Sequence, residues 1–190
     1  MRTTDTGRRW FRLDNAAKIY PVIMNSRHPT VFRVGAIMRE PVDPVLLQRA
    51  AEQAIERFPA FKVRLRAGVF WYYLEENRAR FSVEPETPYP CRRFTRKGNN
   101  RYRLRVLYHN RRIAVEVFHS LADGSGGMIF MKTMVAQYLR LQGETVGFSD
   151  TVFDVDAEPA PEEIEDAYAR HANFRVIRRP SESLAYHLDG

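Results

Sequence analysis

The stretch VEVFHSLADGSGG, residues 115–127, joins a β-type run to a turn that is rich in glycine. The run ends in His119, and an acid, Asp123, follows four residues later with Gly124 directly behind it. From Met128 as far as Gly143 the apolar residues recur at helical spacing, so a helix is expected after the turn. A strand and a helix therefore flank one histidine, whose titration near neutral pH suits a general base.

The residues before this stretch predict the strand that pairs with it. Residues 101–108 alternate apolar and arginine side chains, which is typical of a half-exposed strand with its arginines mostly on the open side. Residues 109–111 supply a turn, and Ile113 to Phe118 forms the returning strand. Successive side chains of a strand point to opposite faces, so His119 is expected on the inner face that Ile113 begins.

Further upstream, residues 31–38 are rich in β-branched residues and predict another strand. Asp43 and Pro44 form a capping start signal, and the apolar spacing behind them predicts a helix up to Pro59. Residues 61–74 favour a hairpin around a tight turn at Ala67 and Gly68. The expected fold class is α+β, with a mixed, largely antiparallel sheet packed against helices.

Composition narrows the class of protein. With 190 residues and 44% hydrophobic residues, the chain is long enough for one substantial globular domain. A single cysteine, Cys91, excludes an internal disulfide framework, and no stretch approaches a membrane span, so a cytoplasmic protein is expected. The net charge of +7 comes from arginines scattered along the chain and not gathered on one face, which argues against nucleic-acid binding.

Several kinds of chemistry compete for His119. A metal centre needs three or four ligands at suitable spacing, and the other histidines stand in unconnected contexts, so no metal is expected. A serine hydrolase needs a G-x-S-x-G turn, which is absent, and residues 125–127 lack the lysine of a phosphate-binding loop. An isolated histidine beside a turn would most simply be a structural core residue.

The context of this histidine is more specific than that. Residues 119–124, HSLADG, match the pattern H-x-x-x-D-G at a strand end and before an amphipathic helix. The chain thereby resembles the superfamily of CoA-dependent acyltransferases, which includes chloramphenicol acetyltransferase, the condensation domains of nonribosomal peptide synthetases and the alcohol acetyltransferases. Residues 13–21, 57–65 and the aromatic run at 70–73 look most like the alcohol acetyltransferase branch, and the resemblance covers about residues 10–145.

The resemblance implies a role for each residue of the motif. His119 would be the general base that takes the proton from an alcohol or amine acceptor, which then attacks the thioester of acyl-CoA, with acetyl as the expected group. Asp123 would be mainly structural and tied to an arginine, and Gly124 would allow close packing beside the substrate channel. Acyl-CoA would be a cosubstrate, with no permanently bound cofactor, and the residues that bind CoA are not identified by the motif.

The length of the chain sets an expectation about domain organisation. Members of this superfamily place the active site between two similar halves or between subunits, whereas only 71 residues follow His119 here. We therefore expect an acyltransferase-like N-terminal domain over residues 1–145, with an acidic linker and the start of a missing C-terminal half over 146–190. That half, or another subunit, would be needed to complete the site. The alternative is a noncatalytic binding or interaction module with the same fold.

Overall fold

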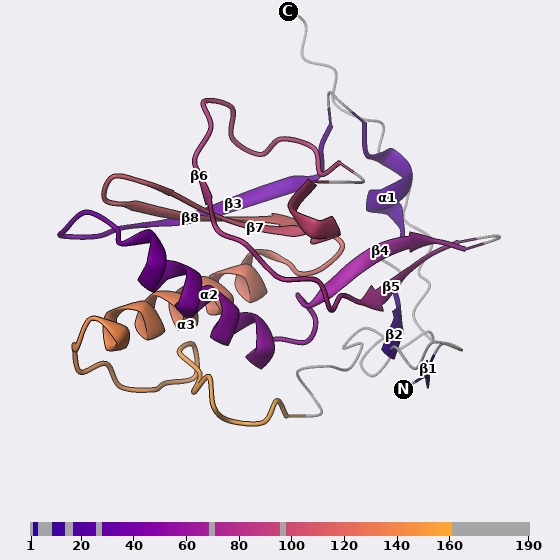
Figure 1. Ribbon diagram of the computed structural model, residues 1–190. Helices are drawn as coiled ribbons and strands as arrows, with labels where there is room; N and C mark the ends of the chain where they lie inside the picture. Colours follow the sequence, from indigo (N-terminus) through magenta and orange to yellow (C-terminus); the bar gives the residue numbers. More distant parts are fainter. Residues whose placement is uncertain are drawn as a thin grey trace, which may run out of the picture.

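The computed structural model describes residues 2–3, 9–13, 17–25, 28–68, 71–95 and 98–160. It confirms the predicted α+β class, with two four-stranded sheets. Two long helices lie on one face of the sheet that contains β3, β7 and β8 (Figure 1). The strand bounds are β1 Arg2–Thr3, β2 Arg9–Arg12, β3 Val31–Ile37, β4 Val63–Ala67, β5 Tyr72–Glu76, β6 Glu84–Pro85, β7 Leu104–His109 and β8 Arg112–Phe118. The helices are α1 Ile19–Ile23, α2 Pro44–Arg57, the 3₁₀ turn η1 Gly98–Arg101, and α3 Gly124–Leu141.

The sheet that leads to the histidine has the strand order β3-β8-β7-β6. β8 pairs antiparallel with β3 from Phe118 opposite Val31 onwards, and with β7 from Val117 opposite Leu104 onwards. Only β6 pairs in parallel, at the edge, where a proline-rich segment is tolerated. The predicted hairpin of β7 and β8 is confirmed, with a short turn in which Asn110 takes a positive φ of 49°.

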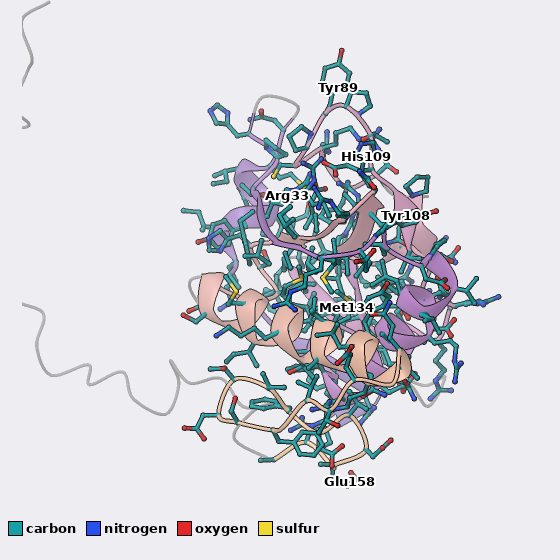
Figure 2. The ribbon with its side chains drawn as sticks, turned by 90° about the vertical axis from the view of Figure 1, so that its left-hand side faces the viewer. Arg33, Tyr89, Tyr108, His109, Met134 and Glu158 are labelled. Atoms are coloured by element: carbon teal, nitrogen blue, oxygen red, sulfur yellow. The ribbon has the colours of Figure 1, made fainter. Side chains whose placement is uncertain are left out.

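The hydrophobic core lies between this sheet and the helices α2 and α3. The inner face of β8 contributes Ile113, Val115 and Val117, all fully buried, as the period of two predicts. Met134 of α3 packs into the same core, and Figure 2 shows it on the opposite side of the sheet from Arg33. The stripe of methionine and aromatic side chains on α3 is therefore core packing.

α2 begins where the capping signal predicted. The Asp43 carboxylate accepts hydrogen bonds from the backbone N–H groups of Val45 and Leu46, at 2.7 and 3.2 Å. These bonds satisfy two of the donors that a helix leaves unpaired at its start, and Pro44 occupies a position that needs no donor. The Asp43 N–H in turn donates to Tyr138 of α3 at 2.9 Å, which ties the two helices together.

The outer face of the sheet differs from the prediction. The arginines of this strand pair were expected to be exposed, but Arg103 and Arg105 are only 7% and 8% exposed. Residues 91–95 cover this face, and the Arg105 guanidinium lies 4.0 Å from the centre of the Phe94 ring. Glu116, 1% exposed, accepts a hydrogen bond from Arg105 at 2.6 Å and another from the Cys91 backbone N–H at 2.7 Å. A paired charge can be buried here because its lone pairs are satisfied.

The second sheet has the order β1-β2-β5-β4. β4 and β5 pair as the expected hairpin, but the predicted tight turn at Ala67 and Gly68 is wrong, because Ala67 belongs to β4 and pairs with Tyr72. The backbone N–H of Gly68 donates to the carbonyl oxygen of Trp71 at 2.8 Å and closes this longer turn. Trp71 is 62% exposed, so this part of the aromatic run does not pack in the core.

Residues 144–160 contain no helix and pack against the helical layer, below α3 in Figure 1. The Phe153 ring stacks on Phe58 with centroids 5.6 Å apart, and the Arg57 side chain donates to the Asp154 carbonyl oxygen at 3.1 Å. Residues 161–190 of the expected linker and C-terminal segment lie outside the described residues, and the domain division at 145 stays a prediction. Over the described ranges, no helix is both long and apolar enough to cross a membrane.

Candidate functional site

His119 directly follows β8 and lies at the start of the turn that leads into α3. Its backbone N–H donates to the carbonyl oxygen of Thr30 at 2.9 Å, which extends the β3–β8 ladder by one more bond. Thr30 presents that carbonyl from a left-handed conformation with φ of 51°, which costs a threonine conformational energy. The hydrogen bond to Thr30 thus fixes the position of the His119 backbone at the end of the β3–β8 pair.

The imidazole is half-buried between two aromatic rings. Tyr20 of α1 stacks on it with centroids 4.6 Å apart and an interplanar angle of 14°. Phe32 of β3 meets it edge-on at 5.3 Å and 64°. Over the described part of the chain, neither ring nitrogen of His119 forms a hydrogen bond, so the rings orient the imidazole while its nitrogens stay available. The strand ends one residue before His119, and the imidazole contacts Phe32, which pairs with Val117 of the inner face and packs against the core.

A glycine of α3 makes room for one of these rings. A Cβ built on Gly127 would lie 2.6 and 2.8 Å from two carbons of the Phe32 ring, closer than real contacts allow. Gly127 is buried where the first turn of α3 crosses β3. The glycine-rich turn therefore lets the helix approach Phe32, which in turn contacts His119.

Asp123 begins α3. Its carboxylate accepts a hydrogen bond from the Gly126 N–H at 2.8 Å, and its carbonyl oxygen accepts one from Gly127 at 3.0 Å. The helix starts at Gly124, four residues before the predicted Met128, because this cap allows the glycines to join its first turn. Asp123 is exposed and forms no ion pair with an arginine among the residues that the structure describes. The implied arginine partner is therefore not found there.

Gly124 has no close neighbour. A Cβ added to it meets nothing within 4 Å among the described residues, so its implied packing beside a substrate channel stays a prediction, whereas Gly127 is closely packed. Ser120, which follows the histidine, is buried and donates from its hydroxyl to the Ala17 carbonyl oxygen at 2.9 Å. This bond anchors the turn to the segment that carries Tyr20.

The sequence motif located His119 and Asp123 but not the residues that orient the imidazole. Tyr20 lies in the stretch 13–21 that contributed to the resemblance, yet nothing in its local pattern indicates a contact with a histidine 99 positions further along. Phe32 occurs in a strand where either face was possible. No group of three or more His, Cys, Asp or Glu side chains that could hold a metal ion is present in the described ranges.

The site thus combines a strand end, a half-exposed histidine and a capped helix within an α+β fold. Solved structures with a similar fold include condensation domains and related proteins. The starter condensation domain of the rhizomide synthetase RzmA matches with a TM-score of 0.55 and 13% sequence identity, over 75% of this chain and 40% of that one. The tallysomycin biosynthesis protein TlmII matches with a TM-score of 0.56 and 11% identity, over 90% of this chain and 44% of that one.

A third match is polyketide synthase associated protein 5 from Mycobacterium tuberculosis, with a TM-score of 0.52 and 14% identity over 70% of this chain and 32% of that one. No family model and no curated protein matches the sequence. The chain therefore has a partial condensation-domain-like fold, and it spans about two fifths of the length of the first two structures named. At these identities the comparison establishes the fold.

Proposed function

We propose that this chain forms the histidine-bearing side of an acyl-transfer site, with His119 as the general base. The observation that carries the proposal is the His119 imidazole, half-exposed at a strand end, oriented by Tyr20 and Phe32, with both nitrogens unpartnered among the described residues. A general base needs a fixed direction and a nitrogen that can reach the acceptor. The likeness of the fold to condensation domains supports this proposal.

In the proposed reaction a ring nitrogen of His119 accepts the proton of an alcohol or amine acceptor. The acceptor oxygen or nitrogen forms a bond to the carbonyl carbon of an acyl thioester, with acetyl-CoA as the expected donor. The tetrahedral intermediate then collapses, the carbon–sulfur bond breaks, and the imidazolium returns its proton to the leaving thiolate. A neutral imidazole is well matched to this proton transfer because its ordinary pKa lies near 6.5.

The second half of the site is part of the same proposal. The three solved structures named above extend well beyond the region that matches this chain. We propose that a further domain or another subunit supplies the opposite wall, the contacts to CoA and the donors that stabilise the oxyanion. Asp123 then acts as a positioning residue, because its carboxylate holds the first turn of α3 and with it Gly127 and Phe32.

The test is release of free thiol from acetyl-CoA in the presence of short alcohols and amines. It uses the chain purified from its natural source together with whatever it assembles with. We expect His119→Ala to lower the rate by about 10²-fold or more, in line with typical general-base contributions. The matched control is His109→Ala, because His109 is exposed at the turn after β7. Near-normal turnover by His119→Ala would contradict the proposal.

A noncatalytic binding module is the second candidate. The observation that favours it is that no carboxylate or carbonyl group in the described residues hydrogen-bonds the imidazole, whereas catalytic histidines are often oriented by such a group. This candidate predicts no thiol release by the wild-type assembly with any acceptor. A measurable rate that depends on His119 would exclude it.

A further inference from the structure

The structure has a large cavity that the acyl-transfer proposal does not use. It has a volume of about 1020 Å³ and lies between α1, the β4–β5 hairpin and the segments on either side of η1. This volume is at the upper end of the range of about 300–1,000 Å³ for small-molecule sites. Its walls are partly apolar and include Pro21, Phe94 and Tyr72.

Every charged side chain that lines this cavity is an arginine. The four are Arg66, Arg93, Arg101 and Arg103, and no carboxylate is among the lining residues. Arg66 has a distant acidic neighbour, Glu75, at 3.8 Å. Arg93 and Arg101 form no ion pair with any residue that the structure describes. The cavity therefore concentrates positive charge, and of its four arginines only Arg66 has an acidic partner among the described residues.

Arg103 is the most informative of the four. It is 7% exposed, its Nε has no hydrogen-bond partner, and one terminal nitrogen donates to the Thr95 carbonyl oxygen at 3.4 Å. Burial, followed by the charges of Arg93 and Arg105, lowers the pKa of Arg103 to about 10. The group remains charged at neutral pH, and an unpaired buried charge is costly.

The neighbouring Arg105 shows what a satisfied arginine looks like on the same strand. Its exposure is similar, at 8%, but it donates to Glu116 at 2.6 Å and to the carbonyl oxygens of Arg92 and Arg93 at 2.7 and 3.1 Å. Two residues away, Arg103 has the same burial without an anionic partner. The difference points to an anion that is not part of the described chain.

We propose that this cavity binds an organic phosphate, with Arg103 as the buried contact and Arg93 and Arg101 as outer contacts. Guanidinium groups match phosphate oxygens in a planar, bidentate geometry, which favours phosphate over a halide. The volume and the Tyr72 and Phe94 rings leave room for an attached aromatic group, such as a nucleoside. The proposal depends on the cavity alone and stands whether or not the chain transfers acyl groups.

The cavity nevertheless adjoins His119. Pro21 in its wall belongs to α1, the helix whose Tyr20 stacks on the imidazole. The carbonyl oxygen of Arg103 accepts a hydrogen bond from the N–H of Phe118, the residue immediately before His119, at 3.0 Å. A ligand in the cavity would therefore contact the same helix, α1, whose Tyr20 stacks on the imidazole of His119.

The experiment is calorimetric titration of the full chain with ADP, with phenyl phosphate and with inorganic pyrophosphate. We expect at least one of the two organic phosphates to bind, with affinity about tenfold or more weaker in both Arg93→Gln and Arg101→Gln, which alter exposed side chains and should not affect folding. The compound that binds more tightly identifies the organic group. Arg39→Gln is the control, because Arg39 is an exposed arginine at the opposite end of the β3–β8 ladder.

Arg103→Met separates a ligand contact from a purely structural role. Because the substitution removes an unpaired buried charge, we expect the ligand-free melting temperature to stay the same or rise while the ligand-induced shift is lost. Three results would overturn the proposal: no binding of any of the three compounds at millimolar concentration, binding that Arg93→Gln and Arg101→Gln leave unchanged, or equal binding of sulfate and chloride.

Discussion

The imidazole of His119 is positioned by ring contacts and a backbone bond instead of by a second polar side chain. Tyr20 and Phe32 orient the imidazole ring, and the hydrogen bond to Thr30 positions the backbone of His119. Aromatic pairs of this kind contribute about 0.5–1.5 kcal/mol beyond the area they bury. Such contacts restrict the ring, and neither of its nitrogens is hydrogen-bonded to a residue that the structure describes.

A second residue, Glu86, makes the stability of the chain depend on pH. Burial alone raises the pKa of Glu86, but hydrogen bonds from Arg112 and Arg33, with their charges, outweigh it and hold the pKa below its ordinary value of 4.5. A group whose pKa is lowered by folding stabilises the native state above its unfolded pKa and loses that contribution as the pH falls. We therefore expect the free energy of unfolding to decrease from about pH 5 towards pH 3.

Urea denaturation at a series of pH values measures this effect. Glu86→Gln should be less stable than the wild type at pH 7, and its stability should change less on acidification. Glu144→Gln is the matched control, because Glu144 is exposed and has no ion pair among the described residues. If Glu86→Gln kept the full pH slope of the wild type, this explanation would be wrong.

At the scale of elements, the start of α3 depends on its cap. Asp123→Ala removes the side chain that accepts from Gly126, and such losses cost about 0.5–2 kcal/mol. Asp123→Asn keeps an equivalent acceptor, so its stability should stay close to that of the wild type. Thermal denaturation of both variants distinguishes a capping role from a role that needs the negative charge. Equal losses in the two variants would show that the charge matters.

The close approach of α3 to β3 predicts that alanine substitutions at two glycines of α3 differ in their effect on stability. Gly127→Ala forces a Cβ against the Phe32 ring, and such overpacking typically costs about 1–3 kcal/mol. The displaced ring should also reduce any activity that depends on His119. Gly124→Ala meets open space and should be neutral or slightly stabilising, because alanine is the better helix former. Chemical denaturation compares the two, and equal costs would contradict the packing argument.

The whole molecule raises the question of where its folded unit ends. The prediction from composition places a boundary at 145, whereas Phe153 stacks on Phe58 and lies 4.8 Å from the Arg57 guanidinium. We expect Phe153→Ala to lower the free energy of unfolding by about 1 kcal/mol or more. Phe148→Ala is the control, because Phe148 is 59% exposed and should matter little. No effect of Phe153→Ala on the unfolding of the α2–α3 layer would support a boundary at 145.

Much of this fold could be predicted because its signals are local. The spacing of apolar residues behind Asp43 and Pro44 predicts α2, and the period of two from Ile113 to Val117 predicts the inner face of β8. The motif at residues 119–124 likewise identifies the histidine and the acid without any tertiary information. The helix and strand patterns repeat at the period of the element that they form, and the motif lies within six consecutive residues.

Other features required the tertiary structure. Arg103 and Arg105 read as exposed in the alternation of their strand, but residues 91–95 cover them, and no pattern within the strand predicts a cover from elsewhere. The contact of Tyr20 with His119 and the arginine-lined cavity likewise join segments that are distant in the sequence. The sequence by itself determined the elements and the candidate base, because helix and strand periodicity is local. Only the packing of distant segments decided which side chains orient that base and which charges are buried.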